Sequence, residues 1–412
     1  MAQFPLDARV AVCPIAHQRD GHSVTIGDLD RQVFVTIPAE GLDILNALAA
    51  GKTVGETVTL YEQTHGETPD VEDFLTTLES EGFVARWDDD AFRAQVARTP
   101  APSREWISPA VAGRLVAAPV LSVCALAVAG ALALVATDPG VIPGPTVLVF
   151  HEHLAALSAT LLAITLVGVI VHELGHRLVA RASGVPARIG IGHRLWFLVA
   201  ETDMTGMWMA PKRRRYLAFL AGPLIDAVCA ALLVGVLWAQ RRGWLTFSPL
   251  LVQFTGALLF SYLLRLLWQC FVFVRTDFYY VLATALDCTN LLADTEDLLR
   301  NRLARLRRSA PVVDQSAIAP AEMRAVRAYS VVWLAGRVLA FASLFLITLP
   351  VLAGYGTEIA RATTGGDSSY GTVDLLTLAI VGFGVQGAGL FVWIRSLLRG
   401  RVQRRTNAMA KP

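Results

Sequence analysis

The chain is long and apolar, with 412 residues, of which 54% are hydrophobic and 17% are charged. Soluble domains carry about 25% charged residues, so this composition excludes an ordinary soluble protein. The five cysteines form no closely spaced pairs, which argues against a disulfide framework and against a cysteine zinc site. The formal net charge of +2 points to no particular partner, because the charges are unevenly distributed along the chain.

Residues 1–90 are predicted to form a small domain of strands and helices. Alternating apolar residues and turn signals between residues 8 and 37 predict three short strands. Three helices follow, the first opening at Pro38, the second at Thr53, and the third covering residues 69–81. The sequence FVARW then closes the domain as a short strand. This order predicts a small N-terminal α+β winged helix-turn-helix domain.

The layout of this domain and its closing sequence LESEGFV resemble the peptide-recognition domain found with enzymes that mature ribosomally made peptides. The peptide chaperone of pyrroloquinoline quinone biosynthesis belongs to the same group. The resemblance implies that the domain captures a leader peptide as an added strand at a sheet edge. A DNA-binding winged helix is the alternative, but helix 69–81 is rich in Asp and Glu, the wrong charge for phosphate contacts. We therefore expect a peptide partner and no nucleic acid.

A linker at residues 91–108 leads to a multi-pass α-helical membrane protein embedded in the lipid bilayer. A transmembrane helix needs about 20 apolar residues. Six runs are long enough: roughly 111–136, 154–181, 215–239, 249–274, 331–353 and 373–397. The membrane part divides into a transmembrane core (109–300), a cytoplasmic basic segment (301–330), and two further spans with a basic tail (331–412).

The charges between the spans predict the orientation in the cell membrane. The connections 182–215 and 275–330 and the C-terminal tail are rich in Arg and Lys, whereas the alternate connections contain few. Basic residues stay on the cytoplasmic side of a membrane, so both termini and the N-terminal domain are predicted to be cytoplasmic.

The second span ends in the sequence His172-Glu173-Leu174-Gly175-His176. Histidines at i and i+4 project from one face of a helix, so these two can share a zinc ion. Glu173 lies beside the first histidine, where it can take a proton from a water activated by the metal. The alternative is a satisfied polar cluster between packed helices. Because ionisable side chains are costly within lipid, three of them favour a functional site.

A third metal ligand is expected from another span at the same depth in the membrane. Asp277 follows the fourth span, which also runs inward, and is the candidate. The third span soon reaches the stretch 221–226, where small residues allow close helix approach and Pro223 loosens the backbone. Two histidines, one carboxylate and an open fourth position are typical of a catalytic zinc site.

The sequence HELGH within a span, AGP in the next and an Asp beyond it resemble the site-2 protease family of intramembrane zinc metalloproteases over residues 150–295. The stretch RTDFYYVLATALDCTNL is similar to a subgroup associated with peptide maturation or export. The resemblance implies zinc ligation by His172, His176 and Asp277, with Glu173 as general base and acid. It also implies substrate contacts at the stretch Gly222, Pro223 and Asp226.

Two positions depart from the pattern of this family. Phe278 replaces the usual Gly after the aspartate, and Asp226 replaces the usual Asn after Gly-Pro. A bulky Phe278 could tilt the carboxylate of Asp277, and an ionised Asp226 cannot donate a hydrogen bond to a substrate carbonyl. Two functions therefore remain open. One is an intramembrane zinc endopeptidase acting on a precursor peptide or membrane protein. The other is a noncatalytic component that hands over a peptide for export or immunity.

Overall fold

The computed structural model describes residues 4–13, 15–20, 23–28, 33–87, 107–148, 154–310, 312–316, 318–363 and 387–395, with five single positions between 371 and 384. The chain forms two compact units. The first comprises Met1–Ala112, Ala180–Ala187 and Met204–Arg215, and the second comprises Gly113–Val179, Arg188–Asp203 and Tyr216–Pro412. The linker predicted at 91–108 lies almost entirely outside the described residues.

The strands of the first unit form two antiparallel sheets. One sheet has the order β2-β3-β4, built from Ala16–Asp20, Ser23–Asp28 and Val33–Pro38. The other pairs β1 (Val10–Val12) with the closing strand β5 (Val84–Arg86). The predicted count of three strands before the helices is therefore wrong, because β1 precedes the three-stranded sheet and pairs elsewhere.

Three helices pack on these sheets: α1 (Gly41–Ala49), α2 (Val54–His65) and α3 (Val71–Ser80). The expected opening of α1 at Pro38 is wrong, because Pro38 ends the edge strand β4, where a missing N–H is tolerated. The start of α2 is correct, since Thr53 and Glu56 form a capping box. The shared core includes the buried side chains of Ile26, Leu45, Leu48, Leu75 and Phe83.

A short segment between two membrane helices also belongs to the first unit. The 3₁₀ helix η3 (Thr205–Met209) lies against β2 and β3, and Met207 within it is fully buried. The burial of Met207 therefore holds this connection against the N-terminal strands.

The second unit is mainly helical, and its helices are those of a membrane protein. Among the described residues, five helical segments are long and apolar enough to cross a bilayer. They are Pro109–Thr137 (α5, Pro109–Leu115, and α6, Ala118–Thr137), Ala155–Ala182 (within α7, Leu154–Ala182), Lys212–Arg241 (α8), Pro249–Gln269 (α9) and Pro320–Leu346 (beginning with α12, Pro320–Ser343). The sixth predicted span, 373–397, lies mostly outside the described residues.

The fifth span begins earlier than its apolar run predicts. α12 starts at Pro320 rather than near residue 331, and its first turns pack against the amphipathic helix α11 (Leu291–Leu306). Packing against a partner helix stabilises turns that are too polar to be read as membrane-spanning. α12 is followed without a break by a π-helical turn, η4 (Leu344–Thr348), and then by α13 (Leu349–Thr363).

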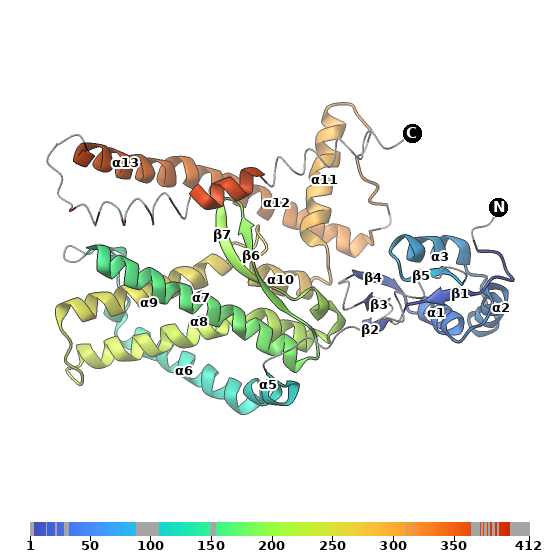
Figure 1. The fold of residues 1–412 in the computed structure, drawn as a ribbon, viewed down its shortest axis with the longest axis horizontal. Coiled ribbons are helices and arrows are strands. Elements are labelled where there is room, and N and C mark those ends of the chain that lie inside the picture. Colours follow the sequence, from blue (N-terminus) through green and yellow to red (C-terminus); the bar gives the residue numbers. More distant parts are fainter. Residues whose placement is uncertain are drawn as a thin grey trace. The chain divides into compact units, whose positions relative to one another are not determined.

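The connection between α7 and α8 contains an antiparallel hairpin that the sequence did not indicate. It consists of β6 (Arg188–Arg194) and β7 (Phe197–Asp203), seen as a long ribbon in Figure 1. Leu195 in its turn has a positive φ of 54°, and Trp196 is buried. Both pack with Phe273 and Val274, which follow α9, so the hairpin is anchored within the membrane unit.

Candidate active site

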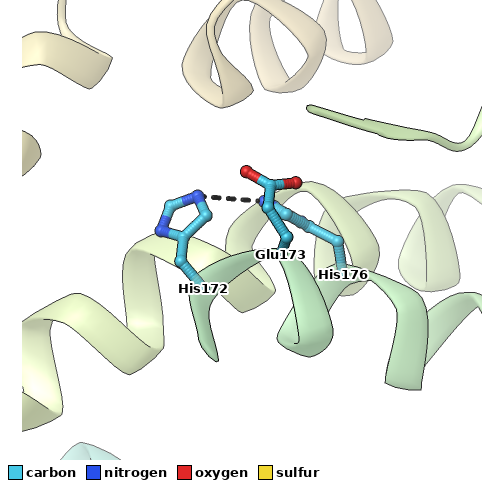
Figure 2. Close-up of side chains that lie close together, drawn as sticks. All are labelled: His172, Glu173 and His176. Carbon is cyan, nitrogen blue, oxygen red and sulfur yellow. Dashed lines mark hydrogen bonds between the residues drawn. The ribbon is translucent and has the colours of Figure 1, made fainter. Parts of the chain in front are cut away.

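Helix α7 brings the three side chains of the HELGH sequence together. His172, Glu173 and His176 are all buried, with 5%, 6% and 1% of their surfaces exposed. The two rings project from the same face of the helix, and their Nε2 atoms lie 3.2 Å apart (Figure 2). One ligand atom from each of the three residues lies within 4.8 Å of the others, a spacing that suits a metal ion.

The outer nitrogen of each ring has a partner that can only accept. His172 Nδ1 lies 2.8 Å from Oδ2 of Asp226, and His176 Nδ1 lies 2.7 Å from the carbonyl oxygen of Ala218. Each Nδ1 therefore carries the proton and donates it. In the neutral rings, both Nε2 atoms then present lone pairs toward each other, the tautomer that metal-binding histidines adopt.

Asp277 completes the cluster from the start of α10 (Asp277–Ala285). The side chain of Thr276 caps this helix, and the backbone N–H of Asp277 donates to Oε1 of the buried Gln269, 3.0 Å away. Its carboxylate oxygens lie 3.1 Å from His172 Nε2 and 3.3 Å from His176 Nε2. The neighbouring side chain of Phe278 therefore does not tilt the carboxylate away from the histidines.

The histidines also govern the charge of this carboxylate. Burial alone would raise the pKa of Asp277, but protonated His176 and His172 outweigh burial through their charge and hydrogen bonds and hold the pKa well below its usual value. On the same helix, burial raises the pKa of Tyr279 to about 12, and its hydroxyl accepts the backbone N–H of Leu292. That bond ties α10 to the start of α11 and fixes Asp277 in place.

The donor set fits a zinc ion. Two imidazole nitrogens and a carboxylate face one another at 3.1–3.3 Å, a spacing at which they repel unless a proton or a cation lies among them. Tetrahedral zinc with ligands at about 2.0–2.1 Å places those ligands roughly 3.3 Å apart. The three distances between His172 Nε2, His176 Nε2 and the Asp277 carboxylate oxygens match this ligand–ligand separation. His172, His176 and Asp277 are thus the residues that can hold the metal.

Glycines allow α7 and α8 to meet at the site. A Cβ on Gly222 of α8 would overlap the Nε2 atoms of both His172 and His176, and one on Gly175 of α7 would overlap the side chain of Ile225. The small residues of HELGH and AGP therefore set the helix separation at the metal ligands. Pro223 lies inside α8 beside this contact. Substrate contacts at Gly222 and Pro223 stay a prediction.

Glu173 is held by the hairpin. The hydroxyl of Thr202 on β7 donates to Oε2 of Glu173 at 2.7 Å and lies 3.1 Å from the Glu173 carbonyl oxygen. A carboxylate fixed in this way keeps its second oxygen available for proton transfer. The sequence offered no signal for this contact, because a single threonine in a basic connection belongs to no recognisable pattern.

The comparison with known families decides the identity of the membrane unit. Residues 159–387, more than half of the chain, match the sequence model of peptidase family M50. The chain belongs to peptidase family M50. Members of family M50, the site-2 protease family, are zinc-dependent intramembrane metalloproteases. Comparison with curated proteins and with solved structures found no match for the chain.

Within this M50 chain, Asp226 also forms an ion pair with Arg265 of the neighbouring helix α9. Asp226 on α8 has no exposed surface, and its Oδ1 lies 2.8 Å from the guanidinium of Arg265 on α9. Its Oδ2 accepts from His172. Both carboxylate oxygens therefore face side chains of the protein. This geometry places Asp226 behind a metal ligand and gives no support to the predicted contact with substrate.

Proposed function

We propose that this M50 chain is an intramembrane zinc endopeptidase that hydrolyses a peptide bond of a ribosomally made or membrane-associated precursor near the cytoplasmic face. The observation that carries the proposal is the convergence of His172, His176 and Asp277 beside Glu173. These four residues supply the donor set and the proton acceptor that hydrolysis requires.

Each residue has a definite part in the reaction. His172, His176 and Asp277 would hold zinc, which when bound supplies a Lewis acid that activates water and polarises the peptide carbonyl. Glu173 takes the proton of the attacking water and later delivers it to the leaving amine. Thr202 keeps the Glu173 carboxylate on the side of the histidines.

The rival is a noncatalytic membrane component that binds a peptide and hands it over for export or immunity. A zinc scaffold needs its ligands but no proton acceptor, so a buried Glu173 with a dedicated hydrogen-bond donor favours the enzyme. Phe278 would favour the rival if it tilted the Asp277 carboxylate away from the metal site. That carboxylate lies within reach of both histidines, which weakens this argument.

Glu173→Gln distinguishes the two functions. The amide keeps the size and the hydrogen bond from Thr202 but cannot accept a proton, so zinc content should stay near one per chain while hydrolysis falls. Loss of a general base costs about 10²–10⁴-fold. Wild type and variant should be compared in membranes on one precursor, by mass of the products. Equal maturation by Glu173→Gln would disprove the protease and favour the handover role.

The N-terminal domain is the proposed site of substrate capture. The sheet order β2-β3-β4 leaves β2 and β4 as edges, and a leader peptide can add to such an edge as a further strand. The order of strands and helices supports the resemblance to peptide-recognition domains with a winged helix-turn-helix layout. The first turn of α3 carries Glu72 and Asp73, which disfavours nucleic acid as the partner.

The cell membrane is the proposed location, with both termini in the cytoplasm. The distribution of Arg and Lys between the spans supports this orientation. It places the N-terminal domain on the same side as the inner end of α7. Reporter fusions after residues 145 and 310 test it: the first should be external and the second cytoplasmic, and a cytoplasmic signal at 145 would refute it.

A further inference from the structure

A buried ion pair lies behind the metal ligand His172, inside the membrane-spanning helices. Asp226 on α8 faces His172 Nδ1 with Oδ2 at 2.8 Å, and its Oδ1 lies 2.8 Å from the Arg265 guanidinium. Asp226 is fully buried, and the Arg265 side chain is 18% exposed. A charged arginine and a charged aspartate within a span are costly, so their presence together calls for a function.

The helices make room for this arginine. The guanidinium of Arg265 donates to the carbonyl oxygen of Gly168 on α7 at 3.1 Å and lies 5.3 Å from the ring centre of Tyr262. A Cβ at Gly168 would lie 2.7 Å from Arg265 Nη1 and 3.0 Å from the Tyr262 hydroxyl. Glycine at this position therefore lets α7 and α9 enclose the guanidinium, so the pair occupies a site built from three helices.

The pair also balances charge around the metal ligands. A carboxylate that accepts the Nδ1–H of a histidine orients the ring and strengthens its Nε2 as an electron donor, more than a neutral acceptor does. The cost is a second buried carboxylate at His172, whose other ring nitrogen already faces Asp277 at 3.1 Å. Arg265 supplies the opposite charge that makes a buried carboxylate tolerable at this position.

We propose that Asp226 and Arg265 act as one positioning pair that sets the orientation and donor strength of His172. The inference rests on the proposed zinc site and adds to it two residues outside the ligand set. Because each residue neutralises the charge of the other inside the protein, their contributions to metal binding are coupled. Removal of Arg265 alone should be more harmful than removal of both charges.

The test compares Asp226→Asn, Arg265→Gln and the double variant with wild type. Arg241→Gln is the matched control, since Arg241 pairs with Asp138 at 3.1 Å at the far end of α8. The zinc dissociation constant is measured by chelator competition in detergent. Substitution of a residue that hydrogen-bonds to a metal ligand typically weakens metal binding about 10–100-fold. We expect the upper part of this range for Arg265→Gln, the lower part for Asp226→Asn and for the double variant, and no change for Arg241→Gln.

A second measurement reports the ligand itself. Proteins loaded with Co²⁺ alone show visible absorption bands that depend on the donor strength of the histidines. These bands should shift in Asp226→Asn and in the double variant but not in Arg241→Gln, whereas a purely structural role would leave them unmoved. If Arg265→Gln fails to accumulate, the neutral double variant carries the test.

Unchanged zinc affinity and unchanged Co²⁺ bands in Asp226→Asn and the double variant would overturn the inference while leaving the zinc site intact. The inference would also be overturned if the free-energy loss of the double variant equals the sum of the losses of the two single variants, because such additivity means that the two residues act independently. A wild-type protein that binds neither metal would instead refute the proposed function, so the two failures are distinguishable.

Discussion

Glu173 and Thr202 show how a single hydroxyl bears on the proposed chemistry. The hydroxyl contacts both the carboxylate and the carbonyl of the same residue, so it restrains the side chain relative to its own backbone. A general base must lie within hydrogen-bond reach of the proton it abstracts. Rotation of Glu173 away from the histidines would therefore lower the rate without disturbing any ligand.

Thr202→Val removes this restraint and keeps the shape of the side chain. A hydrogen bond to a charged group contributes about 1.5–3 kcal/mol, so we expect a rate reduction of roughly 10–100-fold with unchanged zinc content. Turnover of one precursor and metal analysis of the same preparation measure the two effects. Thr255→Val is the control, because its hydroxyl donates to the carbonyl oxygen of Leu251 on its own helix. A variant as active as wild type would show that Thr202 does not hold the base.

At the scale of the helices, the contact between α7 and α8 decides whether the two histidines can share an ion. A Cβ on Gly222 would overlap both rings, so the absence of a side chain sets the helix separation. Neither helix makes the site alone. α7 supplies the two histidines, and α8 supplies the Ala218 carbonyl that orients His176.

Gly222→Ala should push the helices apart at the ligands. Overpacking typically costs 1–3 kcal/mol, so zinc affinity should fall about 10–100-fold. The matched control is Gly235→Ala on the same helix, where an added Cβ meets no atom within 4 Å. Both variants can be titrated with zinc against a chelator. Equal affinities in the two variants would mean that the helix contact does not control the ligands.

The elements that the sequence predicted are those with a local pattern. The i, i+4 spacing of His172 and His176 and the length of the apolar runs depend only on neighbouring residues. The described residues contain the histidine pair and five of the six predicted spans. Asp277 is predicted as the third ligand because the direction of the fourth span puts it at the same membrane depth as the histidines. The β6–β7 hairpin, the supporting role of Asp226 and the contact of Thr202 were missed, because each depends on packing between segments distant in sequence.

At the scale of the whole molecule, the N-terminal strands share a compact unit with the segment that enters α8. η3 lies against β2 and β3, and the chain continues from it into the helix that carries Gly222. The N-terminal strands are therefore joined to the segment that enters α8 by packing within one unit, as well as through the chain. A captured leader would be held in the same molecule as the proposed catalytic site, which raises its effective concentration.

Deletion of residues 1–87 should separate capture from chemistry. Cleavage of a precursor with its leader should fall by 10²-fold or more, because linked binding modules commonly provide gains of 10²–10⁴. A precursor without a leader should be cleaved as before. The deletion also uncovers Met207, so zinc content must be checked first. Equal losses on both precursors, with zinc retained, would contradict a role in capture.

The three acceptor atoms facing one another at the histidines and Asp277 have a consequence for the life of the protein in the cell. Without a proton or a cation among them these atoms repel, so zinc bound as proposed would strengthen the fold as well as supply the chemistry. A ligand present at a hundred times its dissociation constant stabilises the folded state by about 2.7 kcal/mol. The proposed metal site therefore predicts that the abundance of the protein follows the metal supply, because chains without zinc would unfold more often and be removed by quality-control proteases.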